Sequence, residues 1–168
     1  MNKKLWEASL SVKKKSNLFK FEKFLSKKFN YKINKNYNKL FNWSIKNLDL
    51  FWSSVWDFTN VKGRKVDRFK HSKEFIKNKF FVNSKLSFAE NLLSKNDNSK
   101  AITFISENGY REERTWKELN LNTSKLINFF KKNKIVKKDR IAAYMPNQIE
   151  TVEFFLATSA IGAIWSSC

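Results

Sequence analysis

The chain has 168 residues and a formal net charge of +19, because 34 Lys and Arg residues outnumber 15 Asp and Glu residues. Hydrophobic residues make up 42% and aromatic residues 16%, and this apolar content excludes a disordered chain. The single cysteine excludes an internal disulfide, and the three isolated glycines exclude a glycine-rich phosphate-binding loop.

The high positive charge has two interpretations. It is large enough to attract nucleic acid or an anionic membrane without specificity, so a basic module that binds one of these is one hypothesis. The basic residues are mostly Lys, however, and they lie along most of the chain instead of on one element. This distribution favours a general drift in composition, and then no specific nucleic-acid partner is expected.

The sequence shows no targeting or membrane-spanning segment. The basic start "MNKKLWEASLSVKKK" never reaches an apolar core, because Glu7, Ser9 and Ser11 interrupt it. The longest apolar stretch, residues 152–165, is shorter than the about 20 residues that cross a bilayer. We therefore expect a cytoplasmic protein without a transmembrane segment.

Residues 17–29 predict an amphipathic helix, since Leu18, Phe21, Leu25 and Phe29 follow one another at helical spacing with Lys between them. Such a stripe could contact a membrane. Packing against the rest of the protein is the favoured interpretation, because Phe and Leu stripes are mostly core.

The segment 40–61 is rich in Trp and Phe. It predicts a helix with Asn47 as N-cap and Asp49 in the first turn. One side of this helix carries Leu48, Phe51, Trp52, Val55 and Trp56. Aromatic residues between Lys residues could stack on bases, but their spacing favours an apolar wedge between elements.

The basic stretch 62–86 has little periodicity and predicts a surface connection. It contains the only histidine, His71, which has no ligand or triad partner in the sequence and is expected to be solvated. Ser87 and Glu90, at the start of "SFAENLL", then match the capping box of a short helix.

Residues 101–115 predict a β-hairpin. "AITFIS" and "YREERT" read as strands, and Gly109 can take the positive φ that the turn "ENG" needs. Glu112 and Glu113 are expected on a solvated face. Thr115 and Glu118 form a second capping box. The helix that it starts carries Leu119, Leu126, Ile127 and Phe130 on its apolar side.

The last section predicts a βαβ unit. "RIAAYM" is a short strand that Pro146 stops, residues 148–161 read as a helix that Gly162 ends, and "AIWSS" is a second strand. The two strands should be parallel, with a right-handed crossover. Cys168 then lies at the carboxyl end of a strand, where we expect a small packing residue, since no base or other activating group is visible.

The final run "SAIGAIWSSC" is apolar and has nothing after it to pair with its backbone. We therefore expect these residues to form the opening portion of a larger sheet. A strand edge of this kind would be unpaired and prone to aggregation.

Four strings resemble, in order, the N-terminal part of the acetoacetate:CoA ligase branch of the adenylate-forming acyl-CoA synthetase superfamily. They are "LWEAS" (5–9), "LFNWSIKNLDLFWSSVWDF" (40–58), "SFAENLL" (87–93) and "YMPNQIETVEFFLATSAIGAIWSSC" (144–168). Pro146, Asn147 and Glu150 match a P-N-x-x-E pattern that the superfamily shares, and "GAIWSSC" is similar to the acetoacetate branch. Because that branch also begins near "LWEAS", we expect nothing to precede it.

The resemblance implies an α/β fold in two parts. Residues 1–95 would be a helical, aromatic-rich N-terminal cap of the acetyl- and acetoacetyl-CoA synthetase type. Residues 96–168 would be the first hairpin and βαβ unit of the large AMP-binding domain, which this chain leaves incomplete.

The resemblance also implies an ATP-dependent acid–thiol ligase. The full-length enzyme would convert acetoacetate, ATP and CoA, with Mg²⁺, into acetoacetyl-CoA, AMP and diphosphate through an acyl-adenylate. The phosphate loop and later motifs of the family do not occur in these 168 residues. We therefore assign no catalytic, cofactor-binding or metal residue, and we expect the chain alone to be inactive, to bind these ligands weakly and to need the remainder of the same enzyme as its partner. Acetoacetate as the acid, instead of another short acid, rests on seven residues.

Overall fold

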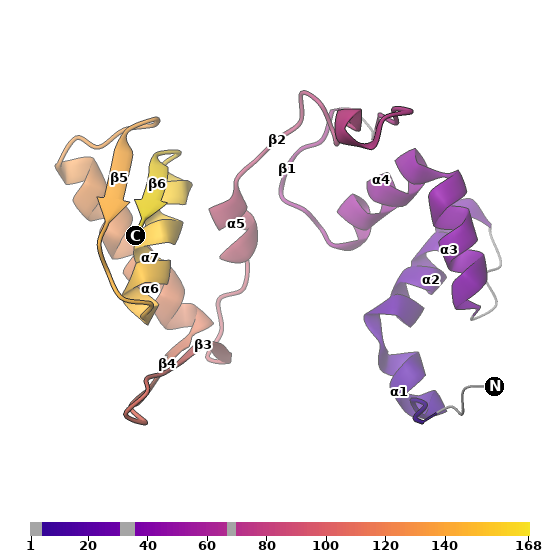
Figure 1. Cartoon of the computed structure of the whole chain (residues 1–168), viewed down its shortest axis with the longest axis horizontal. Coiled ribbons are helices and arrows are strands. Elements are labelled where there is room, and N and C mark those ends of the chain that lie inside the picture. The colour runs from indigo at the N-terminus through magenta and orange to yellow at the C-terminus, as the bar shows by residue number, and fades with distance from the viewer. Residues whose placement is uncertain (1–4, 31–35, 67–69) are drawn as a thin grey trace. The chain divides into compact units, whose positions relative to one another are not determined.

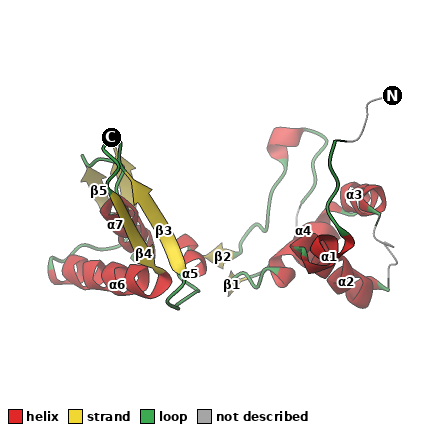
Figure 2. Cartoon of the chain, turned by 90° about the horizontal axis from the view of Figure 1, so that it is seen from below, coloured by secondary structure: helices red, strands yellow, loops and turns green. Residues whose placement is uncertain are grey.

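The computed structural model describes residues 5–30, 36–66 and 70–168. The chain forms two compact units, residues 1–84 and residues 85–168. Helices dominate the first unit, and the second combines helices with strands (Figures 1 and 2). The boundary between the units precedes the helix at Phe88, whereas the sequence divides the two expected domains after residue 95.

The first unit contains four α-helices within its described residues. They are α1 (Leu10–Lys15), α2 (Asn17–Phe29), α3 (Tyr37–Lys46) and α4 (Leu48–Phe58). The basic stretch that follows contains the short strand β1 (Gly63–Arg64) and the 3₁₀ helix η1 (Phe75–Lys77).

Helix α2 confirms the predicted amphipathic pattern at Phe21, Leu25 and Phe29, whereas Leu18 is exposed. Ser16 caps it by accepting a hydrogen bond from the Phe19 amide at 3.2 Å. Phe21 and Leu25 are buried with Leu40 of α3, and full burial of such a side chain contributes about 1.5–3 kcal/mol. The Phe21 ring meets the rings of Phe51 and Phe58 at centroid distances of 6.0 and 5.1 Å. The stripe thus packs mainly against α4 and α3.

Helix α4 begins after Asn47, as predicted, but the Asn47 side chain does not cap it. The side-chain amide of Asn47 instead donates to the Trp43 carbonyl oxygen at 3.0 Å, at the end of α3. Trp56 is buried, and its ring lies 4.9 Å from that of Phe81. The aromatic face of α4 therefore packs partly against the basic stretch, which is otherwise largely exposed.

The second unit begins with β2 and continues in a regular order. Its elements are β2 (Lys85–Leu86), α5 (Phe88–Leu92), β3 (Lys100–Ile105), β4 (Arg111–Thr115), α6 (Trp116–Lys132), β5 (Arg140–Ala143), α7 (Ile149–Ala160) and β6 (Ile164–Ser167). A core of Ala89, Leu119 and Leu156 joins α5, α6 and α7. Leu119 and Phe130, both predicted on the apolar side of α6, are 2% and 3% exposed.

The hairpin is confirmed. Strands β3 and β4 pair antiparallel, with Ile105 opposite Arg111 next to the turn and a bulge between Lys100 and Ile102. Gly109 adopts a φ of 81°, which a residue with a Cβ rarely takes. The strands form a ribbon of their own, seen as two adjacent arrows in Figure 2.

The predicted βαβ unit is confirmed in its strands, its helix and their parallel pairing. Arg140 pairs with Ile164 and Ala143 with Ser167. Gly162 ends the connecting helix with a φ of 73°. Three of the four residues of β6 are exposed, so this strand is not covered by the described residues.

Candidate functional site

The carboxyl edge of β5 and β6 is the candidate site, because open α/β sheets bind ligands outside the carboxyl ends of their parallel strands. The Cys168 amide extends the ladder by donating to the Ala143 carbonyl oxygen at 3.1 Å. Cys168 itself is exposed, so the expectation of a packing residue at this position is wrong. Strand β6, which Cys168 follows, is itself mostly exposed in the described residues.

The segment 144–147 leaves β5 at this edge and leads into α7. Tyr144 is 93% exposed. The Pro146 carbonyl oxygen accepts two hydrogen bonds, from the Gln148 amide at 2.9 Å and from the Thr151 hydroxyl at 2.7 Å. The segment is therefore tied to the first turn of α7, whose N-cap residue Gln148 makes no side-chain capping bond.

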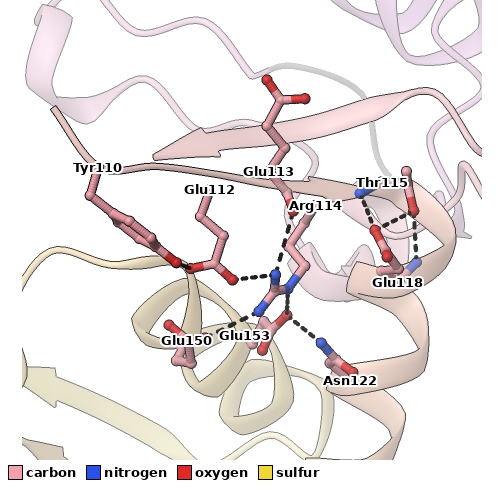
Figure 3. A network of polar contacts seen from close by, with 9 residues as sticks. All are labelled: Tyr110, Glu112, Glu113, Arg114, Thr115, Glu118, Asn122, Glu150 and Glu153. Atoms are coloured by element: carbon pink, nitrogen blue, oxygen red, sulfur yellow. Dashed lines mark hydrogen bonds and ion pairs between the residues drawn. The ribbon is translucent and has the colours of Figure 1, made fainter. Parts of the chain in front are cut away.

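A polar network around Arg114 of β4 contacts α7 in its first turn, at Glu150 (Figure 3). The guanidinium donates from Nη1 to Glu112 of its own strand, from Nη2 to Glu150 at 3.2 Å and from Nε to Glu153 at 3.3 Å. Asn122 of α6 donates to the same Glu153 oxygen at 2.8 Å. One arginine thus joins three carboxylates, and three elements meet at Glu153.

The network is largely removed from solvent. The side chains of Arg114 and Glu153 are 20% and 6% exposed, and that of Glu112 is 28% exposed. Burial lowers the pKa of Arg114, but the hydrogen bond and charge of Glu112, helped by Glu153, outweigh burial and raise this pKa above its usual value. Arg114 is therefore a permanent cation that neutralises part of the carboxylate charge.

The two neighbouring glutamates of β4 have different surroundings. Glu113 is on a solvated side, as expected, where hydrogen bonds from Lys100 and then Arg111 lower its pKa. Figure 3 shows its carboxylate pointing away from the network. The same expectation is wrong for Glu112, which is half-buried against Arg114 and whose charge raises the pKa of Tyr110. Strand alternation places the two carboxylates on opposite faces.

Sequence reasoning missed Arg114, Glu153 and Asn122 as a group. The one available signal is Glu153, an acidic residue within the apolar run of α7 that must find a buried partner. Its partners come from other elements, 39 and 31 residues away, so spacing alone does not identify them.

A pocket of about 660 Å³ lies at the amino end of the same sheet. Lys137 precedes β5 and Gly162 precedes β6, and the rings of Phe88, Phe155 and Trp165 line the apolar part. This pocket therefore includes the amino ends of the strands and not the edge where parallel strands usually bind ligands.

Three further features were considered within the described residues: the histidine, metal-binding groups and membrane-spanning helices. His71 is exposed, as expected. Within the described ranges, no group of three or more His, Cys, Asp or Glu residues is arranged to hold a metal ion. Every helix in residues 5–30, 36–66 and 70–168 is too short or too polar to span a bilayer.

Comparison with known proteins shows which family and which relatives this chain is similar to. Residues 90–168 match the family described as AMP-binding enzyme. An acetoacetyl-coenzyme A synthetase of Rhizobium meliloti (strain 1021) is 32% identical over 165 residues, which cover 98% of this chain and 25% of the relative. One from Xenopus tropicalis is 36% identical over 139 residues, covering 79% of this chain and 20% of the relative.

The solved structure of acetoacetyl-CoA synthetase from Streptomyces lividans matches with a TM-score of 0.83 and 23% identity, over 99% of this chain and 26% of that chain. This likeness shows the fold. The chain spans about a fifth to a quarter of the length of the proteins that it matches. In sequence and in fold, it resembles the acetoacetyl-CoA synthetases, and residues 90–168 carry sequence of the AMP-binding enzyme family.

Proposed function

We propose that this chain supplies part of an ATP-dependent acid–thiol ligase that forms acetoacetyl-CoA, AMP and diphosphate from acetoacetate, ATP and CoA. The similarity to acetoacetyl-CoA synthetases over nearly the whole chain carries this proposal. The reaction passes through an acyl-adenylate, whose formation requires positioning of a triphosphate and stabilisation of developing charge.

The two parts of the chain have different roles in this proposal. Within residues 1–95, the helical cap has an aromatic core that joins α2, α3 and α4, whereas α5 packs against the second part. Residues 96–168 form the opening portion of the AMP-binding domain, and the parallel pair β5 and β6 starts its sheet. The cap stabilises the enzyme, and the second part contributes the sheet edge and the turn into α7.

The described residues do not fit the Mg²⁺ ion that the reaction uses. Glu112, Glu150 and Glu153 lie close together, but each of them forms an ion pair with Arg114. The described residues contain no group of three or more His, Cys, Asp or Glu residues that could hold a metal ion. No step of the reaction is therefore assigned to a residue of this chain, and the groups that bind ATP, Mg²⁺ and CoA come from the rest of the enzyme.

A chimeric enzyme tests the proposal. The matched segment of the Rhizobium meliloti relative is replaced by this chain, and acetoacetate-dependent AMP formation is measured in the presence of ATP and CoA. We expect the chimera to be active and a control relative that lacks the segment to be inactive. A chimera that folds, as judged by circular dichroism and a thermal transition, but forms no AMP would contradict the proposal.

The 168-residue chain alone is expected to show no acetoacetate-dependent exchange of pyrophosphate into ATP. The reason is that it lacks the phosphate-binding loop and the later motifs. The control is the chimera under the same conditions, since it contains both. Clear exchange by the purified chain would show that its own residues form the nucleotide site.

A further inference from the structure

We propose that Arg114 and Glu150 are positioning residues that hold the segment 144–147 in place at the carboxyl edge of the sheet. The inference rests on the proposed function, because it gives that edge a role in a ligase. Neither side chain is assigned a contact with substrate. Their effect passes through the first turn of α7.

The first link is the ion pair between Arg114 Nη2 and Glu150 Oε1, at 3.2 Å. Glu150 lies in the first turn of α7, and the Arg114 side chain is 20% exposed. The guanidinium is fixed by its other bonds to Glu112 and Glu153, since each nitrogen of its planar fork has a carboxylate partner. Arg114 is thus a rigid anchor for the start of α7.

The second link is the Pro146 carbonyl oxygen. It accepts bonds from the Gln148 amide and the Thr151 hydroxyl, and the Thr151 amide donates to the Gln148 carbonyl oxygen at 3.2 Å. A displacement of the first turn of α7 therefore moves Pro146 and with it the chain that leaves β5. The Ile149 side chain, 1% exposed, buries one side of this turn, and Glu150 adds the ion pair that connects the turn to β4.

The structure offers a matched pair of variants. Glu150→Gln and Glu112→Gln each remove one negative charge from the same guanidinium. Glu150 connects Arg114 to α7, whereas Glu112 lies on the same strand as Arg114 and connects it to no other element. Both leave the buried Arg114, Glu153 and Asn122 contacts intact, so the variants should fold.

Hydrogen exchange in the 168-residue chain gives the first measurement. We expect Glu150→Gln to raise the exchange rates of the Gln148 and Thr151 amides by about threefold. Glu112→Gln should leave both rates within error. Equal rates at these amides in the two variants would overturn the inference, whatever the activity of any enzyme.

The chimera gives the second measurement. Glu150→Gln should lower kcat/KM for acetoacetate-dependent AMP formation by about tenfold, mainly through kcat, since a misplaced site loses alignment. Glu112→Gln should change it less than twofold, and both should keep the melting temperature of the parent chimera. Equal losses in the two variants would overturn the inference, whereas an inactive parent chimera contradicts the proposed function and leaves the exchange measurement to decide this one.

Discussion

At the scale of single residues, the positions that matter most are polar side chains that the fold buries. Glu153 is 4% exposed and lies in an apolar helix, where an unpaired carboxylate would be costly. Arg114 and Asn122 supply its bonds. By contrast, the many exposed Lys residues carry the net charge of the chain without fixing a geometry.

Replacing Arg114 by Ala should therefore be far more damaging than replacing Arg111. Arg114→Ala leaves Glu153 buried without its cation, which costs about 3–5 kcal/mol of unfolding free energy. Arg111 is 55% exposed where it pairs with Glu113, so Arg111→Ala should cost less than about 1 kcal/mol. Urea unfolding followed by circular dichroism measures both. Similar losses for the two variants would show that the Arg114 network contributes little.

At the scale of elements, local sequence signals predict the caps and turns whose bonds join near neighbours within one element. Both bonds of the capping box at α6 are present: the Thr115 hydroxyl accepts from the Glu118 amide at 3.2 Å, and Glu118 accepts from the Thr115 amide at 2.8 Å. The hairpin turn at Gly109 and the stop at Gly162 follow from the same kind of local chemistry.

This capping box makes the stability of α6 depend on pH. Hydrogen bonds from the Thr115 backbone amide and then from its side chain lower the pKa of Glu118. A depressed carboxylate pKa in the folded state contributes stability above the pKa of the unfolded state, about 4.3. This contribution is lost as pH falls through the lower folded pKa.

Thr115→Ala should destabilise the unit by about 1 kcal/mol at neutral pH. It should also weaken the pH dependence, because one of the bonds that depress the pKa of Glu118 is gone. Thermal unfolding between pH 7 and pH 3 measures both effects. An unchanged pH profile in the variant would mean that the Thr115 hydroxyl contributes nothing to the lowered pKa of Glu118.

The limits of sequence reasoning lie where elements meet. Asn47 has the residue type of an N-cap, yet its side chain bonds backwards to Trp43, because α3 ends there and also needs a partner. Glu112 and Glu113 have the same sequence context, and only the position of α7 decides which of them is half-buried. The first choice depends on two helix ends that compete for one side chain, and the second depends on contacts between distant residues.

At the scale of the whole molecule, two properties stand out: the charge of +19 and the uncovered strand β6. The charge favours weak, unspecific contacts with polyanions, whose affinity falls steeply with salt. Ile164 of this strand is 48% exposed, and the next residue, Trp165, lines the aromatic pocket together with Phe155.

The isolated chain should bind a dye that reports exposed apolar surface, and it should be poorly soluble, because β6 offers an apolar strand with open backbone groups. The chimera serves as the control, since the rest of the enzyme can cover this surface. A sharp thermal transition of the isolated chain without dye binding would contradict the expectation.

The affinity of the isolated chain for single-stranded nucleic acid should be lost by about 0.5 M salt, because its contacts are electrostatic. Binding that survives this salt concentration would favour a nucleic-acid module.

The Arg114 network also bears on how the second unit melts. A two-stranded ribbon such as β3 and β4 is marginal by itself in water, and Ala101 and Ile102 of β3 pack only partly buried against the core of the unit. The guanidinium of Arg114 in β4 nevertheless donates to Glu153 of α7, and Asn122 of α6 donates to the same carboxylate oxygen. Fraying of the ribbon therefore removes the only cation that Glu150 and the buried Glu153 contact in the described residues. Ribbon and helices should come apart together, in a single cooperative step.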